Sequence, residues 1–376
     1  MFQAHRDNLA ELAREHRLRG LALPHGHDFS SNDYLGLGAS GLLADAIRDG
    51  IAQGIAAGSG GSRLLRGHHP AHEQLEALAA NLFGSEAALF LPTGFTANQI
   101  LYSTLPRTGD LIVYDRLIHA SVHEGIRLSR AEAKRAGHNQ PDHFDALIRQ
   151  WRNKGGTGQI WIGIESLYSM DGDTAPMADF IALANRHDAV LIVDEAHATG
   201  VWGTGGLGLL GDVERGGNVI SLHTLGKALG CDGALICGPA IVKDWLINHA
   251  RPFIFSTAPS PLMAHVGSTA LTIMRDRPDL RDALHARIAR AHDLLPEQFL
   301  LPGSHSQIIP AIIGDNGRTM HLAALLQEAG FDVRGIRPPT VPPGTSRLRI
   351  TITNNVAEAT IDALFAVLAE AMDQAT

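Results

Sequence analysis

Lys227 is the residue of this sequence best suited to covalent chemistry. It lies in "SLHTLGKALG", where an apolar run ends at Thr224 and small residues surround the lysine. A lysine held in a closed, glycine-lined pocket can lose its proton and attack a carbonyl, as Schiff-base chemistry requires. On an open surface the same residue would be an ordinary solvated charge. The neighbouring segments therefore decide whether this stretch forms a covalent site.

Three further segments place functional side chains after apolar runs. In "LIVDEAHATG", Asp194 and His197 end a very apolar run, where a buried carboxylate needs a partner. The protonated ring nitrogen of pyridoxal phosphate is one such partner. In "LPTGFTAN", Gly94 and Phe95 open a helix whose free N–H groups suit a phosphate. In "YDRLIHASVHEG", His119 could stack on a flat ring or move protons. Taken singly, each segment also fits a structural turn, cap or histidine.

The elements that must position these residues alternate between strands and helices. Strand-like apolar runs are separated by helix-sized segments, which predicts an α/β fold with a mostly parallel, covered sheet. The runs are "AALFL", "LIVYD", "QIWIGIE", "AVLIVDE", "NVISLHT" and "GALICG". We expect an N-terminal helix and arm over residues 1–40, with an amphipathic helix over 3–19. A large α/β domain would follow over 41–256 and a smaller α+β domain over 257–376. Ligands of such sheets bind beyond the carboxyl ends of the strands.

The composition of the sequence limits the classes of binding partner and the cellular compartment that we expect. The 376 residues are 45% apolar and 19% charged, with a net charge of -8 and no basic stripe for nucleic acid. No apolar run is long enough to cross a bilayer, and the N-terminus lacks the apolar core of a secretory signal. The two cysteines, Cys231 and Cys237, fit neither a disulfide framework nor a paired zinc motif. We expect a cytoplasmic protein without a metal.

The order of these motifs resembles the α-oxoamine synthase family of fold-type I pyridoxal-phosphate enzymes. The resemblance runs from about residue 29 to the C-terminus. It includes "FSSNDYLGL", "GSGGSRLLRGHHPAHEQLE", "TGFTANQ", "DRLIHAS", "SLYSMDGDTAP", "VDEAHATGVWGTGGLG", "HTLGKALG", "FIFSTAPSP" and "IRPPTVPPGTSRLRIT". The resemblance implies pyridoxal phosphate linked to Lys227, which would also remove the α-proton of the substrate. Asp194 would pair with the ring nitrogen, His197 would bind the phenolic oxygen and His119 would stack on the ring. The remaining implied cofactor contacts are Gly94, Phe95, Ser169, Thr224, Ser256 and Thr257.

The same resemblance implies the substrates and a homodimer. Arg349 would bind the amino-acid carboxylate, and Asn32 and Thr340 would lie nearby, with His119 also facing substrate. Ser256 and Thr257 would reach the phosphate of the neighbouring subunit. The implied reaction joins L-alanine to pimeloyl-CoA or pimeloyl-acyl carrier protein, with loss of CO2, at the start of biotin-ring assembly. The segment before "FSSNDYLGL" is shorter than the family pattern, so the N-terminal substrate arginine aligns with Arg19 or with its neighbour Arg17.

Other functions fit parts of the sequence less well. Relatives that use glycine with acetyl-CoA or succinyl-CoA, or serine with palmitoyl-CoA, share the catalytic set. "RPPTVPPGTSRLR" and "GSGGSR" favour the biotin-pathway reaction, and glycine with acetyl-CoA is the next alternative. The glycines of "GTGGLG" match a dinucleotide-binding G-x-G-x-x-G, but they come well after the strand that ends at Asp194. A metal hydrolase built on "HHPAH" lacks a carboxylate-rich partner motif. A binding protein without activity would have no need of Lys227.

Overall fold

The structure, a computed structural model, describes residues 1–211, 216–296, 299, 301 and 303–374. These residues form two compact units. Unit 1 comprises Met1–Tyr34, Ser169–Asp173 and Asp282–Thr376, and unit 2 comprises Leu35–Tyr168 and Thr174–Arg281. The three-part division expected from the sequence remains a prediction about folding domains.

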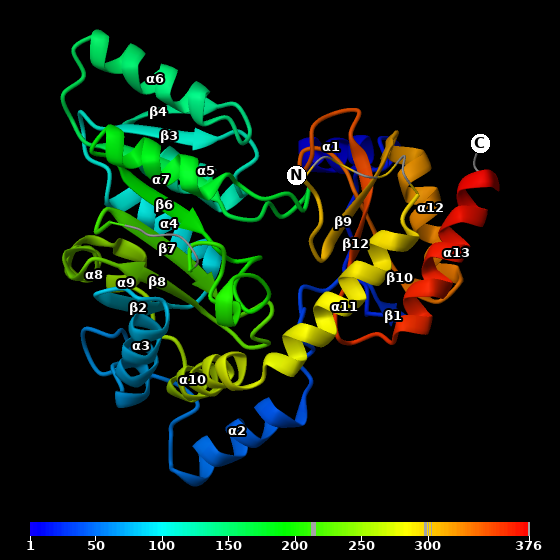
Figure 1. The fold of residues 1–376 in the computed structure, drawn as a ribbon, viewed down its shortest axis with the longest axis horizontal. Coiled ribbons are helices and arrows are strands. Elements are labelled where there is room, and N and C mark those ends of the chain that lie inside the picture. Colours follow the sequence, from blue (N-terminus) through cyan, green and yellow to red (C-terminus); the bar gives the residue numbers. More distant parts are fainter. Residues whose placement is uncertain (212–215, 297–298, 300, 302, 375–376) are drawn as a thin grey trace. The chain divides into compact units, whose positions relative to one another are not determined.

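A seven-stranded sheet forms the centre of unit 2, in the order β2-β8-β7-β6-β5-β3-β4. In Figure 1 its strands run from β4 near the top of this unit to β2 near the bottom. β8 is antiparallel to β2 and β7, and every other pair is parallel. The predicted α/β class with a mostly parallel sheet is therefore confirmed. The strands are β2 (Ala87–Leu91), β3 (Leu111–Asp115), β4 (Glu132–Ala136), β5 (Ile160–Glu165), β6 (Val190–Asp194), β7 (Val219–Thr224) and β8 (Ala234–Gly238).

Both faces of this sheet are covered by helices. Leu111 and Val113 of β3 pack in one apolar cluster with α6 and α7, whereas Ile112 packs in a second cluster with α4, α5 and α8. Successive side chains of a strand point to opposite faces, so strands buried on both sides read as continuous apolar runs. The helices of unit 2 are α2 (Gly41–Ala52), α3 (Pro70–Leu82), α4 (Gly94–Thr104), α5 (Ala120–Leu128), α6 (Pro141–Asn153), α7 (Met177–Arg186), α8 (Ala240–His249), α9 (Arg251–Ile254) and α10 (Pro261–Asp276), with a short 3-10 turn, η1 (Thr204–Gly206).

Unit 1 is built on a three-stranded antiparallel sheet in the order β11-β12-β9. A two-stranded parallel pair joins β1 to β10. The strands are β1 (His27–Asp28), β9 (Ile308–Gly314), β10 (Phe331–Asp332), β11 (Arg334–Ile336) and β12 (Ser346–Thr351). The helices are α1 (Gln3–Arg14), α12 (Asn316–Glu328) and α13 (Glu358–Gln374), and α11 (Pro278–Leu294) begins in unit 2 and ends in unit 1.

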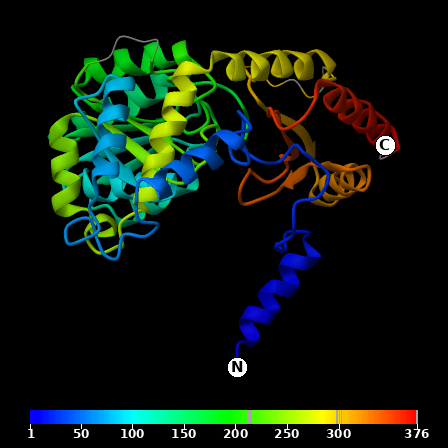
Figure 2. The ribbon, with the colours of Figure 1, turned by 90° about the horizontal axis from the view of Figure 1, so that it is seen from below.

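Two elements differ from the sequence-based expectation. The N-terminal helix was expected over residues 3–19 but ends at Arg14, because His16 adopts a left-handed backbone conformation with φ of 54°. Figure 2 shows α1 extending away from the strands of unit 1, and none of its residues is buried. β4, with the sequence "EAKRA", was not predicted, because an edge strand carries charged residues and has no apolar run.

Among the helices that the structure describes, none has the length and apolar character needed to span a membrane.

Candidate active site

Asp194 ends β6 with a buried carboxylate whose two oxygens both accept hydrogen bonds. The backbone N–H of Ala196 donates to Oδ1 at 2.9 Å, and Asn98 Nδ2 of α4 donates to Oδ2 at 2.7 Å. Asp194 is only 8% exposed, yet it forms no ion pair with any of the residues that the structure describes. A buried carboxylate without a cation is costly. This position therefore suits a ligand that brings a positive charge.

Lys227 lies in the loop that follows β7, next to the turn that follows β6. Its Nζ is 2.7 Å from Nε2 of His197, which is buried in that turn. The parallel register of β6 and β7 pairs Asp194 with Leu222, so both turns start from neighbouring strand ends. The sheet thus brings together an amine and an imidazole that are 30 positions apart in the sequence.

His119 caps the start of α5 and is linked to Asp194 through two neutral side chains. Its Nδ1 is 2.7 Å from Ser121 Oγ and accepts from the Ser121 N–H at 3.2 Å. Asn98 Nδ2 donates to the same hydroxyl at 3.0 Å. Burial lowers the pKa of His119, and the nearby Asp194 carboxylate opposes that shift. The imidazole meets the ring of Phe95 edge-on, at 6.4 Å between centroids.

The N-terminus of α4 offers a place for a phosphate. Thr93 caps the helix by accepting from the Thr96 N–H at 3.1 Å, which leaves the first amides of this 11-residue helix free. A Cβ placed on Gly94 would lie 3.7 Å from Thr224 Oγ1, so the start of the helix adjoins the end of β7. The predicted residues Gly94, Phe95 and Thr224 are therefore close together in unit 2.

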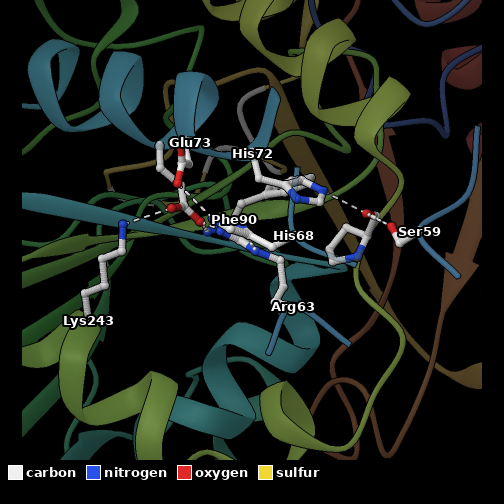
Figure 3. A network of polar contacts seen from close by, with 9 residues as sticks. Ser59, Arg63, His68, His72, Glu73, Phe90 and Lys243 are labelled. Atoms are coloured by element: carbon white, nitrogen blue, oxygen red, sulfur yellow. Dashed lines mark hydrogen bonds and ion pairs between the residues drawn. The ribbon is translucent and has the colours of Figure 1, made fainter. Parts of the chain in front are cut away.

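Ser256 and Thr257 are exposed on the segment between α9 and α10. The loop before α3 holds this segment in place. The Pro259 carbonyl accepts from Ser59 Oγ at 2.7 Å and lies 2.9 Å from His72 Nε2, as Figure 3 shows. Burial is the main cause that lowers the pKa of His72 to about 4. The imidazole is therefore neutral near pH 7, and its Nε2 hydrogen points to the carbonyl.

The other histidines of "HHPAH" take part in a second set of contacts that brace the same loop. His68 bridges Arg63 Nε at 3.0 Å and Glu73 Oε1 at 2.9 Å, whereas His69 caps α3. Glu76 accepts from Arg63 Nη1 at 2.8 Å and forms an ion pair with Lys243 at 2.9 Å (Figure 3). Burial favours a higher pKa for Glu76, but these cations outweigh it and hold the pKa below its ordinary value. The motif thus has a structural use.

Arg349 of β12 is a buried guanidinium in unit 1. Its Nε donates to the Ser169 carbonyl at 2.8 Å, Nη1 to Thr351 Oγ1 at 2.8 Å and Nη2 to Asn32 Oδ1 at 3.0 Å. Arg349 is 6% exposed, and no carboxylate within the described ranges forms an ion pair with it. Neutral oxygens orient the guanidinium but leave its charge uncompensated. This site is suited to an anionic ligand such as a carboxylate.

The structure also brings the predicted N-terminal arginine to a predicted substrate residue. Arg19 Nη2 donates to Thr340 Oγ1 at 3.2 Å, and both side chains are exposed. Arg17 Nε donates to the Pro338 carbonyl at 3.1 Å. Both arginines thus contact the same loop of unit 1. Ser169, the remaining predicted cofactor contact, also belongs to unit 1 and is buried.

Gly208 of "GTGGLG" packs against the carboxylate of Glu195. That carboxylate accepts from Ser166 Oγ at 2.8 Å and from the N–H groups of Leu209 and Leu210 at 3.1 and 2.7 Å. Gly208 has φ of +90°, and a Cβ there would lie 2.4 Å from Glu195 Oε2. Glycine is therefore needed for the close approach of the loop. Gly208 thus has a local structural role.

Glu195 should make stability depend on pH. Its side chain is fully buried, and burial raises its pKa to about 7 from 4.5. The folded protein then holds this proton more tightly than the unfolded chain, so stability should fall by roughly 3 kcal/mol as pH rises from about 4.5 to beyond 7. In Glu195→Gln this contribution should vanish. Urea unfolding at acidic and mildly alkaline pH, with the exposed Glu11→Gln as control, measures it. Equal pH slopes for all three proteins would contradict the prediction.

Sequence reasoning missed several polar residues that contact the predicted ones within each unit. Asn98 orients Asp194 and is 2% exposed, Ser121 joins it to His119, and Tyr34 lies near Arg349. Burial raises the pKa of Tyr34 to about 12, so it stays protonated. A polar residue on the apolar face of a helix, as Asn98 is in "TANQILY", was the one available signal.

The chain belongs to the aminotransferase class I and II family, because the sequence model of that family matches residues 24–368. The chain is also 42% identical to 8-amino-7-oxononanoate synthase of Paraburkholderia xenovorans (strain LB400) over 349 residues, which cover 90% of this chain and 87% of that protein. The resemblance inferred from the motifs is thereby confirmed.

Solved structures share the fold. The 8-amino-7-oxononanoate synthase of Francisella tularensis superposes with a TM-score of 0.77 at 26% identity, covering 93% of this chain and 98% of that one. The serine palmitoyltransferase of S. paucimobilis, solved with bound PLP, has a TM-score of 0.89 at 22% identity and covers 100% of this chain and 98% of its own. The second likeness concerns the fold alone.

Proposed function

We propose that this chain is a pyridoxal-phosphate enzyme that condenses L-alanine with a pimeloyl thioester. The products would be 8-amino-7-oxononanoate, CO2 and the free carrier, in the synthesis of biotin. The observation that carries the proposal is the joint placement of Lys227 against His197 at 2.7 Å and of a buried Asp194, which forms no ion pair within the described part of the chain, at the next strand end. The relatives named 8-amino-7-oxononanoate synthase support the choice of reaction.

The residues of unit 2 fit the cofactor. Bound pyridoxal phosphate supplies an electron sink for the negative charge that develops at the α-carbon of the amino acid. Asp194 would face the protonated ring nitrogen with its uncompensated charge, and His119 would cover the ring. Gly94, Phe95 and Thr224 would hold the phosphate at the start of α4. Ser169 would add a further contact, and Ser256 and Thr257 would contact the phosphate in the other subunit of a homodimer.

Lys227 would carry the proton in this reaction. Its Nζ would bind the cofactor as an amine and, once the amino acid has replaced it, remove the α-proton. His197 holds that nitrogen at 2.7 Å and would also bind the phenolic oxygen of the cofactor. His197 is buried and Lys227 is half-buried, so their contact is partly shielded from bulk water, which strengthens it.

Arg349 would bind the carboxylate of L-alanine, with Asn32 and Thr340 nearby. Its buried charge has no anion among the contacts that the structure describes, so a substrate carboxylate would compensate it. Arg19, held on Thr340, would assist at the acyl substrate. The sequence has only two cysteines, Cys231 and Cys237, and this low cysteine content supports a cytoplasmic location.

Product identification tests the proposed reaction. The purified holoenzyme would be given L-alanine with pimeloyl-CoA, L-alanine with pimeloyl-acyl carrier protein, or glycine with acetyl-CoA, and products would be read by mass spectrometry. We expect the mass of 8-amino-7-oxononanoate with at least one pimeloyl donor and none with glycine. A product from glycine and acetyl-CoA alone would assign the glycine C-acetyltransferase reaction instead.

A further inference from the structure

A buried polar chain joins the turn that carries His197 to the strand that leads to Lys227. Thr199 Oγ1 donates to the Glu195 carbonyl at 2.9 Å and lies 2.8 Å from Nδ1 of His223. On the other side of the ring, Nε2 of His223 is 2.9 Å from Ser221 Oγ. Thr199 and His223 are each 1% exposed. The mechanism described above uses neither residue.

The hydrogen positions in this chain follow from the chemistry of the groups. A threonine hydroxyl has one hydrogen, and here it is donated to the Glu195 carbonyl. The short contact to His223 therefore requires that Nδ1 carry a hydrogen and donate it to Thr199. Phe83 stacks on the imidazole at 3.6 Å between centroids, with 11° between the rings.

A second contact holds the same two segments together. Gly200 has φ of +84°, and a Cβ there would lie 2.7 Å from Cβ of Ala228. The backbone of the β6 turn thus packs directly on the residue after Lys227. Two buried contacts, one polar and one steric, therefore lie between the segments that carry His197 and Lys227.

We propose that Thr199 and His223 are positioning residues that keep the His197 imidazole in hydrogen-bonding distance of the Lys227 amine. The inference rests on the proposed function, since it assigns a reason for that alignment. The buried hydrogen bond between Thr199 and His223 ties the turn after β6 to β7 and so limits the movement of the two segments relative to one another. A small misplacement of reacting groups is enough to slow catalysis markedly.

Two matched pairs of variants isolate the hydrogen bond. Thr199→Val keeps the shape but deletes the hydroxyl, whereas Thr199→Ser keeps it. His223→Asn places an amide donor near the position of Nδ1, whereas His223→Gln places its amide near Nε2 and loses the donor to Thr199. Phe83→Leu serves as a structural control, because it removes the stacking and leaves both hydrogen bonds.

The first readout needs no cofactor. The reactivity of Lys227 toward acetic anhydride would be followed against pH in the cofactor-free protein, with the exposed Lys154 as internal reference. The midpoint should move by about half a pH unit or more in Thr199→Val and His223→Gln and stay near wild type in the other variants. If the Lys227 midpoint is lower in these two variants than in wild type, the lysine donates to His197 in the wild-type protein, because that bond stabilises the charged amine. If it is higher, His197 donates to the neutral amine.

The second readout uses the holoenzyme. The pH midpoint of the visible cofactor band should shift in the same two variants, and kcat should fall about tenfold with little change in KM for L-alanine. Folding is checked by thermal unfolding, in which Phe83→Leu should lose stability without moving either midpoint.

Unchanged midpoints in folded Thr199→Val and His223→Gln would overturn the inference. Equal shifts in Thr199→Val and Thr199→Ser would overturn it too, since the hydroxyl would then not matter. If the valine variant does not fold, the histidine pair decides alone. The proposed function is tested separately: it fails if Lys227→Ala keeps the visible band of the cofactor. The titration of the cofactor-free protein tests the hydrogen bond and does not depend on which reaction the enzyme catalyses.

Discussion

Lys227→Ala should abolish the visible band of the bound cofactor and lower product formation by about 10⁴-fold or more. The amine is the proposed nucleophile and proton carrier, and alanine can do neither. His197, which lies 2.7 Å from Nζ, would lose its partner but keep its buried position. Absorbance of the dialysed holoprotein and the rate of product formation measure the two effects.

The sequence has only three other lysines that could bind the cofactor, so each of them can be tested. The others are Lys134, Lys154 and Lys243. Lys134 forms an ion pair with Glu132, and Lys243 forms one with Glu76. Lys154→Ala, at an exposed position, is the matched control and should change neither the band nor the rate. Borohydride treatment followed by peptide mapping should place the cofactor on Lys227. A label on any other lysine would overturn the assignment.

Arg349→Lys should lower kcat/KM for L-alanine by about 10² to 10³-fold, mainly through KM. Lysine keeps the positive charge but loses the fork that binds a carboxylate with two parallel hydrogen bonds. It would also remove the guanidinium donors to Asn32 and Thr351, and Asn32 would keep the Tyr34 hydroxyl as a donor. Steady-state kinetics and the change in the cofactor spectrum on adding L-alanine report on binding.

A substrate lacking the carboxylate provides the second half of this test. Wild-type protein should bind L-alanine far more tightly than ethylamine, and Arg349→Lys should lose most of that preference. Arg347 is a suitable control, because it lies two residues away on β12, is also buried and already pairs with Asp171. Arg347→Lys should cost stability and leave the preference intact. An unchanged preference in Arg349→Lys would assign the carboxylate to another residue.

Several features of the site could be predicted from the sequence, because their signals are local. The apolar runs that became β6 and β7 are recognisable within a few residues, and Asp194 and Lys227 follow those runs directly. The motif order further indicated the family, which the comparisons confirm. Strand ends and turn residues are defined by the chain on either side of them, so short stretches of sequence suffice.

Local sequence patterns were sufficient to predict the fold class and the residues at the carboxyl ends of the strands. The partners of those residues became visible only in the folded chain. Nothing near Asp194 in the sequence predicts that Asn98 binds it, and nothing near Arg349 shows that its charge lacks an anion. The charged edge strand β4 and the contact of Thr199 with His223 were equally hidden. The physical reason is that partner choice depends on contacts between distant segments, whereas periodicity reports only on neighbours along the chain.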